Sequence, residues 1–139
     1  MLISNCMKHD VKTCSTSTTV FDAVKKMAEH NVGSLVVVDG KKPVGIFTER
    51  DLLKRVVAPS KDPQKVTIAD VMTKDIFAVD ASDFIGNVHH SLSEKGIRHA
   101  PVVDKGVLVG IISSTDLTRI LDAQIYGLYF RKKDLSGDY

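Results

Sequence analysis

The sequence consists of two copies of one unit. When the chain is aligned with itself at an offset of 65, residues 3–52 face residues 68–117 without a gap, and 13 of the 50 pairs are identical. The matching pieces include NVGSLVVVD with GIRHAPVVD, and VGIFTERDL with VGIISSTDL. A repeat of about 50 residues is a supersecondary unit that buries its apolar face against a neighbour. The sequence therefore predicts two similar units packed on each other.

Each copy is expected to form a short strand, a helix, a strand pair and a second helix. In the first copy, STSTTV supplies helix-capping residues, and apolar residues then recur at helical spacing up to EHNVG. LVVVD and VGIF are apolar runs separated by the turn residues GKKP, and ERDLLKRVV follows them. The second copy repeats this order. Because the strands are too uniformly apolar to face water on either side, we expect an α/β (α+β) fold with the units paired about a pseudo-twofold axis.

The repeat divides the chain into four parts. They are a first repeat (1–60), a linker (61–65), a second repeat (66–122) and a C-terminal tail (123–139). A helix that starts near Asp116 could continue through Leu128 into the tail. The tail is more apolar than a free segment, so it is expected either to pack on its own module or to contact a subunit or partner. Its apolar and basic residues are Ile125, Tyr126, Leu128, Tyr129, Phe130, Arg131, Lys132 and Lys133.

Composition and charge exclude several classes of function. The net charge is +2 with interleaved signs, which gives no electrostatic case for nucleic acid or an acidic membrane. No apolar run approaches the roughly 20 residues of a bilayer span, and the N-terminus does not resemble a leader. Cys6, His9 and Cys14 lack a fourth zinc ligand nearby, and two cysteines suit a reducing compartment. We expect a cytoplasmic protein with no membrane contact.

Both copies place a hydroxyl residue and an acid at the junction between strand and helix. Thr48 and Ser113 stand at expected N-cap positions, with Asp51 and Asp116 three residues later. Helix capping accounts for both residue types. It does not account for the glycine that precedes each hydroxyl residue by three positions. A carboxylate fixed at a helix start also suits the vicinal hydroxyls of a ribose, and free N–H groups there suit phosphate. The sequence leaves both interpretations open.

The doubled motif resembles a known family. GIFTERD and GIISSTD follow the pattern Gly, apolar, x, Ser or Thr, x, x, Asp, which is typical of a pair of CBS (cystathionine β-synthase) domains, the Bateman module. ADVMTKDI and IRHAPVVD are also typical of that family, and the resemblance covers residues 3–121. It implies a stand-alone, energy-sensing regulatory module that binds AMP, ADP or ATP between the repeats and requires no cofactor.

The resemblance also implies residue roles. Asp51 and Asp116 would bind ribose hydroxyls. The ribose or phosphates would also contact Thr48, Arg50, Ser113 and Thr115. The adenine would lie against Val32 and Ser34 in a first site, and against Ile97 and His99 in a second. Backbone groups would close the two pockets, from Val11 and Lys12 or from Ile76 and Phe77.

The two copies differ where basic residues would face phosphate. The second copy has Arg98 and His99 where the first has Gly33 and Ser34. The resemblance implies that such basic residues point into the central cleft, so Arg98, His99 and Arg50 are expected to contact phosphates jointly. A solvated pair before a strand is the alternative for Arg98 and His99. We predict two unequal sites, and the sequence does not decide which is stronger.

Several other readings stay open. The same aspartates would suit S-adenosylmethionine or NAD, and a scaffold or nucleic-acid-binding protein could use the fold with empty clefts. His89 is expected to be a partly buried packing residue, and neither it nor His90 has a ligand set or nucleophile nearby. Without a nucleophile elbow, metal triad or Gly-rich phosphate loop, we predict that the protein is not an enzyme. The resemblance implies a homodimer and an unidentified effector protein as partners.

Overall fold

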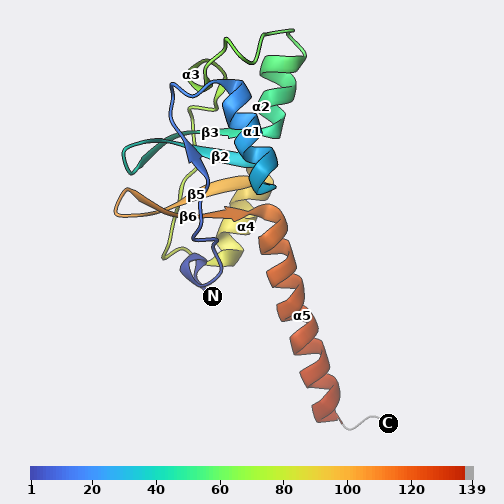
Figure 1. Cartoon of the computed structure of the whole chain (residues 1–139). Coiled ribbons are helices and arrows are strands. Elements are labelled where there is room, and N and C mark those ends of the chain that lie inside the picture. The colour runs from blue at the N-terminus through green and yellow to red at the C-terminus, as the bar shows by residue number, and fades with distance from the viewer. Residues whose placement is uncertain (137–139) are drawn as a thin grey trace.

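The protein is a mixed α/β fold built from two three-stranded sheets (Figure 1). The computed structural model describes residues 1–136, with side chains as far as residue 128. In each sheet the first strand is parallel to the second and the third is antiparallel to it. This confirms the fold class predicted from the repeat. The strands are β1 (Thr13–Cys14), β2 (Ser34–Asp39), β3 (Lys42–Thr48), β4 (Val79–Asp80), β5 (His99–Asp104) and β6 (Val107–Ser113).

The register of the two sheets repeats the offset of 65. Ser34 pairs with Thr48 in the first sheet, and His99 pairs with Ser113 in the second. Both strand pairs have an irregularity at the same place, after Val37 and after Val102. The two copies therefore share their strand geometry as well as their sequence pattern.

Helices α1 (Val20–His30) and α4 (Ile85–Lys95) end where local sequence signals predict, and α1 also begins at such a signal. Thr19 caps α1 by accepting a hydrogen bond from the Asp22 amide, and α1 ends at Asn31 in a left-handed conformation. Gly96 ends α4 in the same way, with φ of 63°. The helices are η1 (Ile3–Asn5), α1 (Val20–His30), α2 (Glu49–Asp51), η2 (Leu52–Val57, a π-helical continuation of α2), α3 (Ile68–Val71), α4 (Ile85–Lys95) and α5 (Ser114–Ser136).

Each hydrophobic core includes residues from the other copy of the repeat. The core around α1, β2 and β3 includes Ile68, Val71 and Met72, which follow the linker. The core around α4, β5 and β6 includes Ile3, and Met7 packs against it. The segments that cross are 1–8 and 66–73, and we call them the crossing segments. The exchange is reciprocal, so the two copies are interlocked.

Hydrogen bonds at the crossing segments also follow the pseudo-twofold relation. The Ile68 amide donates to the Thr18 carbonyl at 2.8 Å, and the Ile3 amide donates to the Asp83 carbonyl at 2.8 Å. Further along, Thr73 exchanges two backbone hydrogen bonds with Ile46 on β3. Lys8 exchanges the equivalent pair with Ile111 on β6. Backbone pairing therefore fixes each crossing segment beside the third strand of the other copy.

The crossing segments account for the glycine that stands three positions before the capping hydroxyl residue in each copy, which is Gly45 or Gly110. A Cβ atom at Gly45 would lie 2.6 Å from the Met72 sulfur and 3.0 Å from the Thr73 carbonyl oxygen. At Gly110 it would lie 2.5 Å from the Met7 sulfur and 2.9 Å from the Lys8 carbonyl oxygen. A side chain at either position would force the methionine sulfur to move and would crowd the backbone carbonyl beside it. The glycine of each motif therefore makes room for the segment that packs across it.

Helix α5 starts in the second core and then leaves the body of the molecule (Figure 1). Leu117 is fully buried, and Ile120 and Leu121 pack against the core. The predicted tail residues Ile125, Tyr126 and Leu128 are each more than 60% exposed, which means that their side chains do not pack back on the body. The side chains of Tyr129, Phe130, Arg131, Lys132 and Lys133 lie outside the described residues. Within residues 1–136 no helix combines the length and the apolar character that a bilayer span requires.

Candidate functional site: a cavity between the two copies

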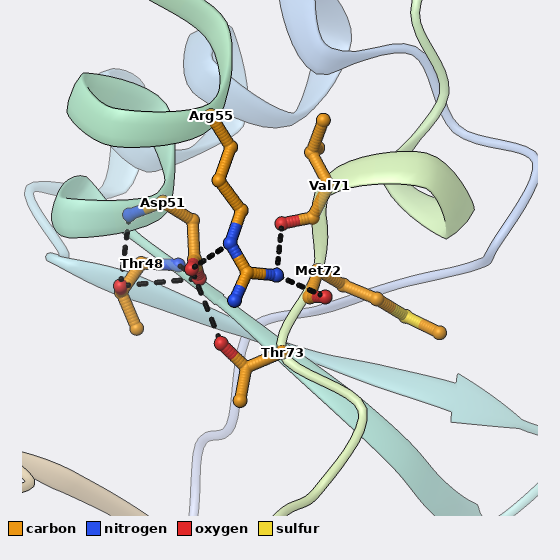
Figure 2. Close-up of polar contacts among 6 residues, drawn as sticks. All are labelled: Thr48, Asp51, Arg55, Val71, Met72 and Thr73. Carbon is orange, nitrogen blue, oxygen red and sulfur yellow. Dashed lines mark hydrogen bonds and ion pairs between the residues drawn. The ribbon is translucent and has the colours of Figure 1, made fainter.

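The first strand–helix junction is a reciprocal capping arrangement (Figure 2). The Thr48 hydroxyl accepts from the Asp51 amide at 3.4 Å. One carboxylate oxygen of Asp51, Oδ2, accepts from the Thr48 amide at 3.0 Å and from the Thr48 hydroxyl at 3.2 Å. The capping interpretation of GIFTERD is therefore correct.

The second oxygen of Asp51 contacts the crossing segment of the other copy. Oδ1 accepts from the Thr73 hydroxyl at 3.1 Å and lies 3.6 Å from Nε of Arg55. The Arg55 guanidinium donates to the Met72 carbonyl at 2.8 Å and to the Val71 carbonyl at 3.3 Å (Figure 2). Asp51 is 6% exposed, and its two oxygens already have partners on both copies. A ribose hydroxyl could reach this carboxylate by replacing one of the two threonine hydroxyls.

Sequence reasoning did not identify Arg55 or Thr73. Arg55 lies four residues after Asp51, a helical spacing that could have indicated the contact. Thr73 lies 22 residues after Asp51 and meets it only through the exchange of segments. The corresponding residues of the second copy are Ile120 and Lys8, so this network is not repeated.

The second junction is more open. The Ser113 hydroxyl accepts from the Asp116 amide at 3.0 Å, which is the expected cap. The Asp116 side chain is 20% exposed, and it faces Lys8 at 3.7 Å and Arg119 at 3.8 Å. These are long contacts made by exposed cations, so they hold the carboxylate weakly.

A cavity of about 280 Å³ lies between the first junction and the second copy. It contains eight of the predicted site residues: Thr48, Arg50, Asp51, Ile76, Phe77, Ile97, Arg98 and His99. The sequence did not single out the rest of the lining, which is Gly33, Ile46, Glu49, Thr73, Asp75, Lys95, Gly96 and Pro101. The motif of one copy therefore faces the pocket residues of the other.

This grouping differs from the expected one. We expected Val32 and Ser34 to accompany Asp51, and Ile97 and His99 to accompany Asp116. In the structure, Ile97 and His99 line the cavity at Asp51, whereas Ser34 is 5% exposed within β2. The crossing segment lies along β3 and brings Ile76 and Phe77 to the motif of the first copy, and His99 at the start of β5 lies close to Gly33.

The other predicted residues lie outside this cavity. Val11, Lys12 and Val32 are half-buried, and Lys12 pairs with Asp10 at 2.9 Å. Thr115 lines a shallow depression with Ser114, Thr118, Arg119 and Asp122 on α5. Ser113 and Asp116 stay at the second junction.

The cavity has an apolar wall and a basic wall. Ile76, Phe77 and Ile97 provide the apolar wall, and the Lys95 ammonium lies 5.1 Å from the centre of the Phe77 ring. Arg50 and Arg98 lie on the basic wall, and among the described residues neither guanidinium has a hydrogen bond or ion pair. A flat apolar group joined to an anion would match this division.

His99 is placed between the two junctions. Burial lowers the pKa of its imidazole, and the nearby Glu49 carboxylate opposes that effect by raising the pKa. The Arg98 guanidinium lowers the pKa further. Burial therefore favours the neutral ring, and an anion bound in the cavity would favour protonation.

The two cysteines pack against the two cores. Burial raises the pKa of the Cys14 thiol to about 11, and Cys6 and Cys14 are both free. Among residues 1–136 no group of three or more metal-ligating side chains could hold a metal ion. His89 is half-buried, as expected for a packing residue, and its Nε2 lies 3.1 Å from the Thr118 hydroxyl of α5.

Both halves of the chain match the same family model. The CBS domain model matches residues 3–58 and again residues 68–123. An uncharacterized protein of Methanopyrus kandleri is 35% identical over 85% of this chain. The mitochondrial CBS domain-containing protein CBSX3 of Arabidopsis thaliana is 35% identical over 84%. The chain spans 61% and 63% of the lengths of these two relatives.

Solved structures of CBS-domain proteins have the same fold. A CBS-domain protein from Burkholderia ambifaria has a TM-score of 0.81 and 33% identity, covering 87% of this chain and 91% of that one. A hexameric CBS-CP12 protein from bloom-forming cyanobacteria has a TM-score of 0.78 and 32% identity, with coverages of 85% and 66%. The CBS domain pair of MJ0100, in complex with 5′-methylthioadenosine and S-adenosyl-L-methionine, has a TM-score of 0.80 and 27% identity, with coverages of 89% and 98%. This chain, with its two interlocked copies, belongs to the CBS-domain family and forms a tandem CBS pair.

Proposed function

We propose that the chain is a non-catalytic regulatory module that binds one adenine nucleotide, AMP, ADP or ATP, in the cavity at Asp51. One observation carries this proposal. Thr48, Arg50 and Asp51 of one copy line the same cavity as the apolar and basic residues 76–77 and 97–99 of the other. At about 280 Å³, the cavity is close to the lower end of the usual range for small-molecule pockets.

Each part of the nucleotide has a matching wall. The adenine would lie against Ile76, Phe77 and Ile97. The ribose hydroxyls would take the place of the Thr73 hydroxyl at Asp51, since a vicinal diol suits a carboxylate. The phosphate would meet Arg50 and Arg98, whose guanidinium groups suit phosphate oxygens.

The position of the cavity provides a route to regulation. Its walls come from both copies, and Asp51 is bonded to the crossing segment through Thr73. A ligand that displaces the Thr73 hydroxyl would change the contacts that join the copies. It would regulate an effector protein only if the two arrangements bind the ligand with different affinities.

S-adenosylmethionine or NAD is the second candidate ligand. The pair in MJ0100 was solved with 5′-methylthioadenosine and S-adenosyl-L-methionine, which carry an adenosine but no phosphate. The two arginines of this cavity favour the phosphate-bearing ligands, NAD included, because 5′-methylthioadenosine has no anionic group and S-adenosylmethionine offers them only one carboxylate. A scaffold with an empty cavity is the third candidate.

We also propose that the protein forms a homodimer in the cytoplasm. Ile125, Tyr126 and Leu128 form an exposed apolar group on α5, and groups of this kind often mark contacts between proteins. The cyanobacterial CBS-CP12 relative is hexameric, which shows that a protein of this fold can assemble.

Calorimetric titration of the purified chain with AMP, ATP, NAD, S-adenosylmethionine and a short oligonucleotide separates these candidates. We expect the nucleotides to bind and Arg98→Gln to weaken them about tenfold, which corresponds to about 1.4 kcal/mol. Arg119→Gln is the matched control, because Arg119 is 76% exposed and lies outside the cavity. Binding of S-adenosylmethionine alone would support the second candidate. If no adenosyl ligand bound, the scaffold with an empty cavity would be the remaining candidate.

A further inference from the structure

A histidine lies where the two copies touch. His99 begins β5 of the second copy, where it pairs with Ser113 and lines the cavity between the copies. A Cβ atom on Gly33 of the first copy would lie 3.8 Å from Cε1 of His99 and 3.1 Å from Oε1 of Glu49. The imidazole of one copy and the carboxylate of the other therefore approach the same point.

The repeat itself does not require a histidine at this position. The residue of the first copy that corresponds to His99 is Ser34, which is 5% exposed and pairs with Thr48 in the same register. The residue of the second copy that corresponds to Glu49 is Ser114. A small hydroxyl residue thus satisfies the packing at this place in the strand. The histidine and the glutamate occur at one of two equivalent places, so they add a property that the fold does not need.

Charged groups from four parts of the chain face the imidazole of His99. The carboxylates are those of Glu49 on α2 and Asp116 on α5, and the cations are Arg98 and Lys8. Nζ of Lys8 lies 3.7 Å from Oδ2 of Asp116, whereas Glu49 forms no ion pair among the described residues. The other charged side chains that line the cavity are Arg50, Asp51, Asp75 and Lys95. A proton on the ring would therefore place a cation beside a carboxylate of the other copy that has no ion-pair partner.

The folded chain favours the neutral ring. Burial lowers the pKa of His99 below its ordinary value of 6.5, and Arg98 and Lys8 lower it as well, whereas Glu49 and Asp116 raise it. The unfolded chain takes up the proton more readily for that reason. The stability that the neutral ring contributes is complete above pH 6.5 and is lost as the pH falls through the lower pKa of the folded state.

We propose that His99 makes the contact between the two copies sensitive to pH. In mild acid the protonated ring attracts the Glu49 carboxylate of the other copy and competes with Lys8 for Asp116. Lys8 belongs to the crossing segment 1–8, so both changes alter contacts that join the copies. The response needs no nucleotide, and the inference therefore goes beyond the proposed function and does not depend on it.

An NMR titration of the histidine rings without nucleotide measures the pKa directly, and His99→Gln identifies the signal. We expect the pKa of His99 to lie below the ordinary value. Glu49→Gln removes a carboxylate and should lower that pKa further, whereas Arg98→Gln removes a cation and should raise it. Asp39→Asn, at the far end of β2, is the matched control and should leave it unchanged. A pKa at or above the ordinary value, or a shift in the same direction for both charge variants, would overturn the inference.

Thermal melts at about pH 7.5 and about pH 5.5 measure the consequence for stability. The natural chain should melt at a lower temperature in acid, and His99→Gln should lose less, relative to its own value at the higher pH. His90→Gln should behave like the natural chain, because His90 is 73% exposed and pairs with Glu94. An equal loss in the natural chain and His99→Gln would overturn the inference, whatever the nucleotide titrations show. If His99→Gln does not fold, the opposite shifts in Glu49→Gln and Arg98→Gln decide.

Discussion

Asp51 joins the two copies through a single side chain. One of its oxygens accepts from Thr48 in its own copy, and the other accepts from Thr73 on the crossing segment. Arg55 links the same carboxylate to the carbonyl groups of residues 71 and 72. The residue is a helix cap and an inter-copy contact at once.

The two motif aspartates are therefore expected to differ in their effect on stability. Asp51→Ala leaves the Thr48 amide and the Arg55 guanidinium without their buried partner and should lower the free energy of unfolding by about 1–3 kcal/mol. Asp116→Ala removes only long, exposed contacts and should cost less than about 1 kcal/mol. Urea denaturation of the two variants measures both values. Equal losses would contradict the network drawn around Asp51.

The motif glycine is expected to be intolerant of a methyl group. Gly45→Ala brings a Cβ against Met72 and the Thr73 carbonyl and should destabilise the fold by about 1–3 kcal/mol. Gly86→Ala, on α4 with nothing within 4 Å, should be neutral or stabilising by up to about 1 kcal/mol. Thermal unfolding of both variants provides the comparison. A neutral Gly45→Ala would mean that the crossing segment packs elsewhere.

At the scale of elements, the repeat and the local patterns predicted the strand pairs and the helix before and after each of them, but not η1 or α3. Thr19 and Gly96 illustrate this, because capping depends on residues that are neighbours in sequence. The crossing segments could not be predicted, since Met72 and Met7 owe their positions to contacts with the other copy. The cavity groups the predicted site residues differently from the expectation. Thr73 reaches the lining of the cavity only because segment 66–73 lies beside β3.

Helix α5 is the element that the proposed homodimer would use. Ile125→Lys with Leu128→Lys places charges in the exposed apolar group and should convert a dimer to a monomer with little change in melting temperature. Light scattering after gel filtration measures the mass. Phe84→Ser, which changes a residue 60% exposed outside α5, is the control and should leave the mass unchanged. A dimer that persists in the lysine variant would assign the interface to another surface.

In the whole molecule, each copy contributes its crossing segment to the core of the other copy. The units that fold together therefore differ from the repeats of the sequence. A fragment of residues 10–73 retains the complete first core, including Ile68, Val71 and Met72. A fragment of residues 1–65 has nearly the same length but lacks those three residues. We expect the first fragment to keep more helical circular dichroism and a cooperative melt, although a domain of this size is marginal. Equal behaviour of the two fragments would contradict the exchange of segments.

One cavity, lined by both copies, is the proposed binding site of the nucleotide. The most direct measurement is a calorimetric titration with ATP of the natural chain, Asp51→Asn and Asp116→Asn, all kept below their melting temperatures. We predict one ATP per chain, a loss of about tenfold or more for Asp51→Asn, and a change of less than about threefold for Asp116→Asn. Equal losses for the two variants, or no binding of ATP to the natural chain, would contradict the claim.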